Sequence, residues 1–346
     1  MRIAPTKTAW LDPHCSARIV SRRSLRYAAP PDPALDRPAH VRAGSGLAWV
    51  GSRLAVVQDD ANFIALVDPA TGQATDIPLP PGPNAQRLFD DTRKTKHLKL
   101  DLEACFTVPT ADGVRLIAIG SGSKPVRERI VVVDLTADAL RVENLRVLDA
   151  TAFYAQLHQR TEFSGSELNL EGVVLRDQTL LFFQRGNGAP RNELRAINAV
   201  GELDWSAFQA YVDSHAAAER VPSLGKVTQY DLGQIADVPF TFTDAALGPD
   251  GQILFLASAE DSSDSVTDGV VHGTRIGALT REGDVRMAPL HDEHGAPSRV
   301  KAEGIALDLE DPTKAWLVVD MDDPSLAAEL LQVELTFPAR RLHAPS

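Results

Sequence analysis

Residues 168–174 read LNLEGVV, in which a glutamate and a glycine interrupt an apolar run with the composition of a β-strand. Carboxylates are usually excluded from such runs, because burying an ionised group without a partner is costly. Glu171 therefore needs an explanation, and the first test is whether the chain repeats the pattern. A repeated carboxylate at the start of a strand indicates a repeated structural unit.

Four further stretches align with LNLEGVV, and each places a polar residue and then a small residue before a short apolar strand. They are AGSGLAWV at 43–50, LDLEACFTV at 100–108, TFTDAALGP at 241–249 and VKAEGIALD at 300–308. The aligned polar residues are Ser45, Glu103, Glu171, Asp244 and Glu303. The small residues that follow them are Gly46, Ala104, Gly172, Ala245 and Gly304. The chain thus carries five copies of one unit.

Each copy continues with a second strand that ends in polar residues and with a third strand, and four copies add a fourth, more polar strand. Units of four short antiparallel strands arranged radially are typical of a β-propeller. The fifth copy lacks its fourth strand, whereas residues 17–27, ARIVSRRSLRY, form a strand-like segment without a partner. Pairing the two would close the ring and remove exposed edges.

We therefore predict an all-β fold in which residues 1–346 form a single five-bladed β-propeller of four-stranded antiparallel blades. The blades start near residues 45, 103, 171, 244 and 303, and the strand at 17–27 closes the last one. Trp205, Phe208 and Tyr211 follow Asp204 at helical spacing, which predicts a helix inserted at about 204–219 with Asp204 as its N-cap. The alternative is two unrelated β-sandwich domains.

The net charge and the distribution of apolar residues limit the kinds of partner and the compartment that we expect for the protein. A net charge of −12 argues against nucleic acid and fits a protein that binds cations. The N-terminus lacks the apolar core of a signal peptide, of about 7–15 residues. No run approaches the ~18 apolar residues of a membrane span. We expect no membrane association and a cytoplasmic location, or a periplasmic one if a leader was removed; the oligomeric state is left open.

The repeated polar residues should converge, because the first strand of each propeller blade lines the central channel. Glu103, Glu171, Asp244 and Glu303 would then form a carboxylate ring that the Ser45 hydroxyl completes. Four unpaired anions repel one another, so either a bound cation or basic residues folded over the ring must neutralise them. Oxygen ligands alone favour Ca²⁺, with Mg²⁺ as the alternative. The acids could instead be solvated turn residues at the blade tips.

A second circle of polar residues is expected at the channel rim, where the second strands end. Its members are Asp59, Asp60, Ser121, Ser123, Arg185, Asn187, Glu260, Asp261, Asp320, Asp322 and Asp323. Arg185 would direct a guanidinium towards the acidic ring, where it could neutralise the acids or hold a small anionic molecule. Asp320 or Glu260 could act as a general base.

These features resemble the calcium-dependent propeller hydrolases. The five blades and the acidic channel are similar to those of the calcium-activated nucleotidases, whose central calcium is held by serine and glutamate side chains. Ser45, Glu103, Glu171 and Glu303 match such a ring, whereas Asp244 departs from it. The strand starts also resemble the esterase-like phytases and the bacterial propellers grouped with them. The gluconolactonase family has a similar metal-centred channel but normally six blades.

Two functions follow as hypotheses. The first is a metal-dependent hydrolase of a phosphate ester or anhydride, in which Arg185 stabilises the charge of the transition state. The second is a non-catalytic propeller that binds a ligand or a protein and in which the acidic ring is structural. Propellers host many functions, so the fold alone does not choose between them.

Overall fold

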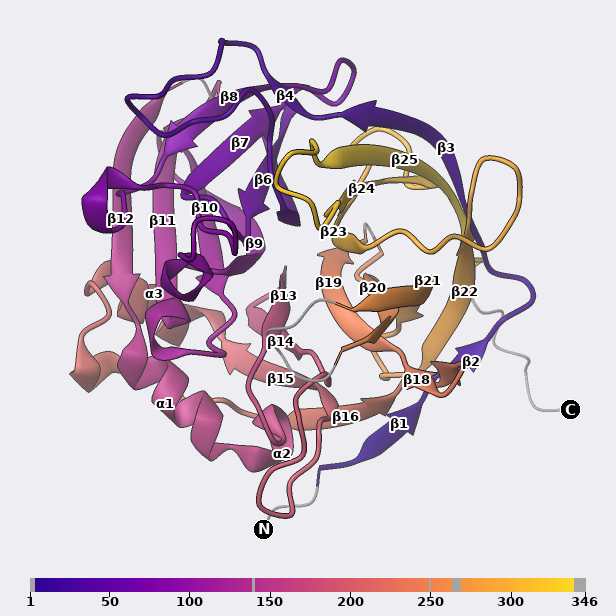
Figure 1. Ribbon diagram of the computed structural model, residues 1–346. Helices are drawn as coiled ribbons and strands as arrows, with labels where there is room; N and C mark the ends of the chain where they lie inside the picture. Colours follow the sequence, from indigo (N-terminus) through magenta and orange to yellow (C-terminus); the bar gives the residue numbers. More distant parts are fainter. Residues whose placement is uncertain (1–3, 139–140, 249, 263–268, 339–346) are drawn as a thin grey trace, which may run out of the picture.

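The structure is a computed structural model that describes residues 4–138, 141–248, 250–262 and 269–338 (Figure 1). Antiparallel sheets stand around a common centre, in a propeller-like arrangement, and the prediction of an all-β fold is confirmed. In the described part of the chain, no helix is long and apolar enough to cross a membrane.

The first two sheets come from the first half of the chain. The first sheet contains β4 (Arg26–Tyr27), β5 (Gly44–Val50), β6 (Arg53–Gln58), β7 (Phe63–Val67) and β8 (Gln73–Pro78). The second contains β9 (Leu102–Pro109), β10 (Gly113–Gly120), β11 (Arg129–Thr136) and β12 (Val142–Asp149). Two residues join β5 to β6, and the first of them, Gly51, has a φ of 59°. Positive φ at this position is what a tight hairpin turn requires.

The remaining strands form a third sheet, a nine-stranded sheet and a small hairpin. The third sheet contains β1 (Thr6–Thr8), β13 (Leu170–Arg176), β14 (Thr179–Gln184), β15 (Asn198–Asp204) and β16 (Val227–Asp231). The nine-stranded sheet contains β2 (Trp10–Leu11), β3 (Ser16–Ser24), β19 (Thr241–Leu247), β20 (Ile253–Asp261), β21 (Val270–Leu279), β22 (Val285–His291), β23 (Ala302–Leu307), β24 (Lys314–Val319) and β25 (Glu329–Thr336). The hairpin is β17 (Gln234–Ile235) with β18 (Val238–Pro239).

The innermost strands follow one another in a closed cycle. β5 contacts β9, β9 contacts β13, β13 contacts β19, β19 contacts β23, and β23 contacts β5 again. Buried apolar side chains fill the space between each neighbouring pair of strand groups, so the core is divided into wedges around the centre. This arrangement brings the first residues of the five innermost strands towards one axis.

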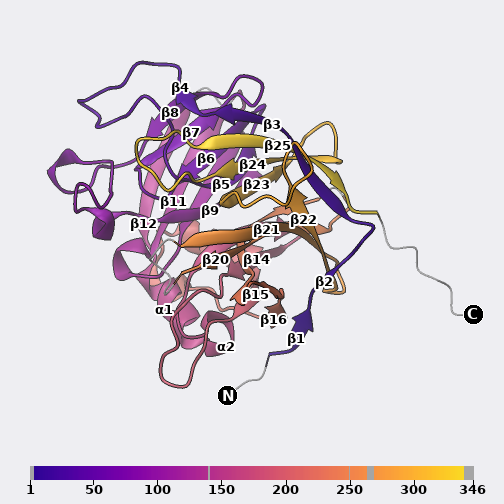
Figure 2. The same ribbon diagram turned by 45° about the vertical axis from the view of Figure 1, so that its right-hand side comes forward.

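The N-terminal segment runs along the outside of the sheets (Figure 2). β1 pairs in parallel with β16, β2 with β22 and β4 with β8. β3 pairs antiparallel with β25 over most of its length, and its buried Ala17 and Ile19 enter the core. The segment predicted at 17–27 is therefore two strands, of which β3 is the partner of β25.

The helices lie in the connections. They are α1 (Thr151–Gln159), α2 (Thr161–Ser164), α3 (Trp205–Asp213) and the 3₁₀ turns η1 (Pro83–Ala85), η2 (Lys96–Leu98), η3 (Pro125–Arg127) and η4 (Ala218–Arg220). α3 is the inserted helix, and the Asp204 side chain accepts the Ala207 amide as its N-cap. It ends at Asp213, earlier than predicted, because His215 and Ala216 adopt positive φ and break the helix.

Candidate functional site: an acidic cavity at the centre

A β-bulge lies at the start of every innermost strand. Gly44 pairs with Gln58 and Gly46 with Val57, so Ser45 is left without a partner in the ladder. The same shift in register leaves Glu103, Glu171 and Glu303 without a partner in the ladders of β9, β13 and β23. A bulge re-aims the side chain of the extra residue, so these four residues share one structural position.

In β19 the bulge falls one residue earlier than the sequence alignment predicts. Phe242 pairs with Ala257 and Asp244 with Leu256, so the residue left out is Thr243. Thr243 is therefore the equivalent of Ser45 and of the three glutamates, and Asp244 takes the place of the small residue. The sequence alignment is wrong by one residue in this copy. Asp244 and Ala245 have the same acid and small-residue pattern as the other copies, but the position of a bulge is set by strand pairing.

Asp244 has a different environment from the glutamates. Its Oδ2 accepts the backbone amide of Ile305 at 2.8 Å, and the amides of Ala245 and Leu47 also hydrogen-bond to the carboxylate. The residue is buried, and burial raises its pKa well above the usual range. Asp244 does not line the central cavity described next, and it instead ties the strands β5, β19 and β23 together.

The small residues explain how closely the innermost strands approach. A Cβ placed on Gly46 would lie 2.8 Å from the carbonyl oxygen of Glu103, and one on Gly304 would lie 3.0 Å from the Gly46 backbone. Any larger side chain at these two positions would push neighbouring strands apart.

A cavity of about 50 Å³, which we call the central cavity, lies at the bulged ends of these strands. It is lined by Ser45, Asp59, Lys99, Asp101, Glu103, Arg127, Asn169, Glu171, Arg185, Asn187, Glu260, Lys301, Glu303 and Asp320. The structure thus brings together every predicted ring and catalytic residue except Asp244. Of the predicted rim residues, this cavity is lined by Asp59, Arg185, Asn187, Glu260 and Asp320, and not by Asp60, Ser121, Ser123, Asp261, Asp322 and Asp323. Seven carboxylates and four basic side chains face this space, which leaves an excess of three formal negative charges.

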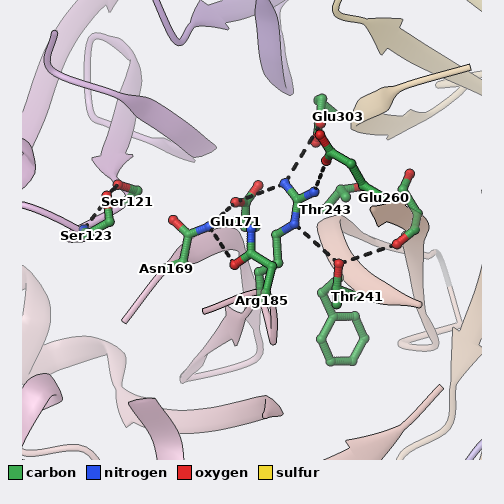
Figure 3. A network of polar contacts seen from close by, with 12 residues as sticks. Ser121, Ser123, Asn169, Glu171, Arg185, Thr241, Thr243, Glu260 and Glu303 are labelled. Carbon is green, nitrogen blue, oxygen red and sulfur yellow. Dashed lines mark hydrogen bonds and ion pairs between the residues drawn. The ribbon is translucent and has the colours of Figure 1, made fainter. Parts of the chain in front are cut away.

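Arg185 lies among the carboxylates of the central cavity (Figure 3). Its Nη1 donates to Glu171 at 3.3 Å and lies 3.9 Å from Glu303, and its Nη2 donates to Glu260. Nε donates to the Thr241 hydroxyl at 3.3 Å. The guanidinium therefore neutralises this side of the cavity. Burial raises the pKa of Glu171 to about 7, although the charge of Arg185 lowers it.

A second group of acids lies on the other side of the central cavity. Asp59, Asp101 and Glu103 each offer one oxygen, and these oxygens lie within 4.8 Å of one another. We call them the acidic triad; the spacing suits a metal ion with oxygen ligands at about 2.4 Å. Lys99 pairs with Asp59 and lies 2.5 Å from Asp101, which Arg127 also contacts at 2.8 Å.

Glu103 differs from the other acids of the cavity in forming no ion pair with a described residue, although the charge of Lys99 acts on it. Among the residues that the structure describes, none forms an ion pair or a hydrogen bond with its carboxylate. Burial and the charges of Glu171, Asp101 and Asp59 raise the pKa of Glu103 well above its usual range. Glu303 has a related deficit, because its Oε2 is buried without a hydrogen-bond partner. A bound cation would offset the charge of Glu103 and give Oε2 of Glu303 a partner.

Sequence analysis did not name Lys99, Asp101 or Asn169 as members of this site. A signal for the first two is present in KLDLE at 99–103, where a lysine and two acids alternate with leucines. Alternation places side chains on one face of an extended chain. Arg127, a basic residue that lies near the predicted rim in the sequence, is brought to Asp101 by η3 in the folded chain.

A second cavity, of about 270 Å³, adjoins the first and shares Asp59, Lys99 and Asp320 with it. We call it the vestibule; its other charged lining residues are Asp60, Asp90, Asp91, Lys96, Asp322 and Asp323. Acids outnumber basic residues here as well, so the approach to the central cavity favours cations.

Comparison with solved structures finds only distant likeness. A glutaminyl cyclase from Myxococcus xanthus is 8% identical at a TM-score of 0.45, covering 97% of this chain and 99% of its own. An α-L-arabinanase from Penicillium chrysogenum is 7% identical at a TM-score of 0.42, and the match covers 91% of this chain and 98% of the arabinanase. A gluconolactonase from Xanthomonas campestris is 14% identical at a TM-score of 0.38, and the match covers 86% of this chain and 88% of the gluconolactonase. With TM-scores below 0.5, none of these activities is carried over to this chain.

No curated protein sequence matches the chain. One family model does, over residues 40–335, which include the innermost strands and every charged residue of the central cavity. The chain belongs to this family, the family of unknown function DUF6929.

Proposed function

We propose that the protein binds a divalent cation at the acidic triad, Ca²⁺ with Mg²⁺ as the alternative, and uses it as a metal-dependent hydrolase of a small phosphate ester or anhydride. The observation that carries the proposal is the acidic triad, of which Asp101 is buried and Asp59 and Glu103 are half-buried, and in which Glu103 forms no ion pair with any described residue. The excess of three negative charges in the central cavity supports it. Unpaired buried carboxylates are costly, and a cation with oxygen ligands removes that cost.

The corrected ring supports the choice of ion. With Thr243 in place of Asp244, the bulged positions carry two hydroxyls and three glutamates: Ser45, Glu103, Glu171, Thr243 and Glu303. Thr243 does not line the central cavity, because its hydroxyl donates to the Ala302 carbonyl at 2.8 Å, so the ring that faces the cavity consists of Ser45 and the three glutamates. These are the residues that match the ring implied by the resemblance to the calcium-activated nucleotidases. Ser45 lines the same cavity as the triad, so its hydroxyl oxygen is a further expected ligand.

When bound, the cation would polarise a phosphoryl oxygen and lower the pKa of a water molecule. The side chains then have separate tasks. Arg185 holds Glu171 and Glu260 in place and stabilises negative charge in the cavity. Asp320 lies at the junction of the central cavity and the vestibule, where it can accept a proton from incoming water.

Two observations favour a second candidate function, a non-catalytic ligand-binding propeller. Arg185 is engaged by Glu171, Glu260 and Thr241, so each of its three nitrogens already has an acceptor. The central cavity of about 50 Å³ has room for a few water molecules and not for a whole phosphate ester. On this proposal the ions hold the innermost strands together and the vestibule receives the ligand.

The proposal includes the architecture that places the site. We count five blades, one for each innermost strand, and take β3 as the outer strand that closes the last blade beside β25. The closed cycle of innermost strands supports this count. All 346 residues would then form one domain with a single axial site.

The experiment compares wild type with Glu103→Gln and with the surface control Glu202→Gln. Glu103 is suited to the test because it forms no ion pair with a described residue, and in the described part of the chain Glu202 pairs with Lys226 at the surface. We expect Ca²⁺ or Mg²⁺ to raise the melting temperature of wild type and of the control, and to have little effect on Glu103→Gln. Hydrolysis of phosphate esters and anhydrides should follow the same order.

Two results would decide against parts of this proposal. If elemental analysis, calorimetry and melting curves show no divalent cation on wild type, the acidic triad is not a metal site. If the cation binds but a panel of phosphomonoesters, nucleotides and lactones is not hydrolysed, the non-catalytic function replaces the hydrolase.

A further inference from the structure

Lys99 occupies the place in the acidic triad where a cation would bind. Its Nζ pairs with Asp59 and lies 2.5 Å from Oδ1 of Asp101, and these are two of the three acids of the triad. The lysine is 5% exposed, so its ammonium is almost fully removed from solvent. The ammonium is thus held between two carboxylates of the triad, as a bound cation would be.

The two acids depend on Lys99 to different degrees. Asp101 keeps Arg127 at 2.8 Å and the Ser121 hydroxyl as partners when the lysine is set aside. Asp59 has no ion pair other than that with Lys99 in the described part of the chain. The ammonium is thus the element that holds Asp59 near Asp101 when no other cation is present.

The Lys99 side chain also borders a second acidic space. Lys99 lines both the central cavity and the vestibule, and the vestibule presents the carboxylates of Asp60, Asp90, Asp91 and Asp322. Its backbone is anchored at the end of η2, where the Lys99 amide donates to the Lys96 carbonyl. A flexible four-carbon stem on a fixed backbone can move its charge between two acidic spaces.

We propose that Lys99 is a tethered cation that competes with the divalent cation for the acidic triad. The ammonium holds the triad together in the metal-free protein and moves into the vestibule when a divalent ion binds. Lys99 thereby sets the cation affinity of the site. The inference rests on the proposed function only in assuming that the triad accepts a divalent cation.

The first test measures Ca²⁺ binding by calorimetry in Lys99→Met, Lys99→Arg and the matched control Lys96→Met. Lys96 lies in the vestibule and contacts Asp91 at 3.9 Å, so its replacement removes the same charge nearby without touching the triad. We expect Lys99→Met to bind Ca²⁺ at least about tenfold more tightly than wild type, since a competing charge is removed from a partly buried site. Lys96→Met and Lys99→Arg should stay within about threefold of wild type.

The second test uses wild type alone, so it does not depend on the folding of a variant. Lysine labelling followed by mass spectrometry should show little modification of Lys99 without Ca²⁺ and a severalfold increase when Ca²⁺ is bound. Lysines outside the two cavities, such as Lys226, should not change.

The outcomes separate this inference from the proposed function. If wild type and Lys99→Met bind Ca²⁺ equally, or if Lys99 stays protected in the bound protein, the inference is wrong while the metal site stands. If only Lys99→Met binds Ca²⁺, the inference holds and the metal-dependent function of wild type fails, because the lysine is then the resident cation. If neither binds, both are wrong.

Discussion

The carboxylate of Asp244 accepts the backbone amide of Ile305 at 2.8 Å, a contact that joins two neighbouring innermost strands. Ala245 and Leu47 contribute amides to the same carboxylate. Asp244→Ala should therefore lower the free energy of unfolding by about 2–4 kcal/mol, because buried amides lose their acceptor. Denaturant titration measures this, and Asp244→Asn, which keeps an acceptor oxygen, should cost less. Equal losses for the two variants would contradict the assigned role.

Arg185 is the counter-ion for one side of the central cavity. Arg185→Met would leave Glu171, Glu260 and Glu303 without their shared partner, so we expect a loss of about 3–5 kcal/mol in the free energy of unfolding. The surface control Arg281→Met, which loses only an exposed pair with Asp177, should lose less than about 1 kcal/mol. Similar stability of the two variants would show that the cavity acids do not need Arg185.

The N-terminal segment can be removed in steps. A chain that starts at residue 13 lacks β1 and β2, which are short parallel additions at sheet edges, and should fold with a melting temperature lower by a few degrees. A chain that starts at residue 26 also lacks β3 and leaves β25 without its outer partner. Exposed edges aggregate, so this chain should not unfold cooperatively. Calorimetry and size-exclusion chromatography make the comparison, and a cooperative transition in the shorter chain would contradict ring closure by β3.

The two cysteines should be unreactive in the folded protein. Burial raises the pKa of the Cys15 thiol to about 11 and that of Cys105 well above its usual range. The thiolate is the reactive form, so little of it is present at about pH 8. A thiol reagent should therefore modify both residues only after unfolding in denaturant. Rapid modification of either thiol in the native protein would show that its surroundings open readily.

The ion pair between Asp134 and Arg115 should make stability depend on pH in the acid range. Burial would raise the pKa of Asp134, but the hydrogen bond and the charge of Arg115 outweigh it, and the folded-state pKa is lowered. The pair therefore stabilises the fold above the unfolded-state pKa and loses its contribution as the pH falls through the folded-state value.

The variant Asp134→Asn tests this pH dependence. At about pH 6 it should be less stable than wild type by about 1 kcal/mol, and the difference should disappear towards about pH 2. Denaturant titrations of both proteins across this range give the difference. A difference that is constant with pH would mean that packing, and not the charge of Asp134, is responsible.

The repeated strand pattern was sufficient for much of the fold. The repeated acid and small-residue pairs, the apolar runs that follow them and the N-cap at Asp204 are local signals, and each predicts an element that the structure contains. The convergence of Ser45, Glu103, Glu171 and Glu303 on one cavity follows from the same repeat, because equivalent strands place equivalent residues at equivalent depths.

Other features were decided only by the tertiary structure. Thr243 replaces Asp244 because strand pairing sets the position of a bulge, and a one-residue slip in sequence cannot be detected where neighbouring residues imitate the pattern. Lys99, Asp101 and Arg127 enter the site through a turn and a loop whose courses depend on packing. Sequence could predict that the acids gather around the axis. Which cation each acid pairs with depends on side-chain distances, and only the folded chain sets those distances.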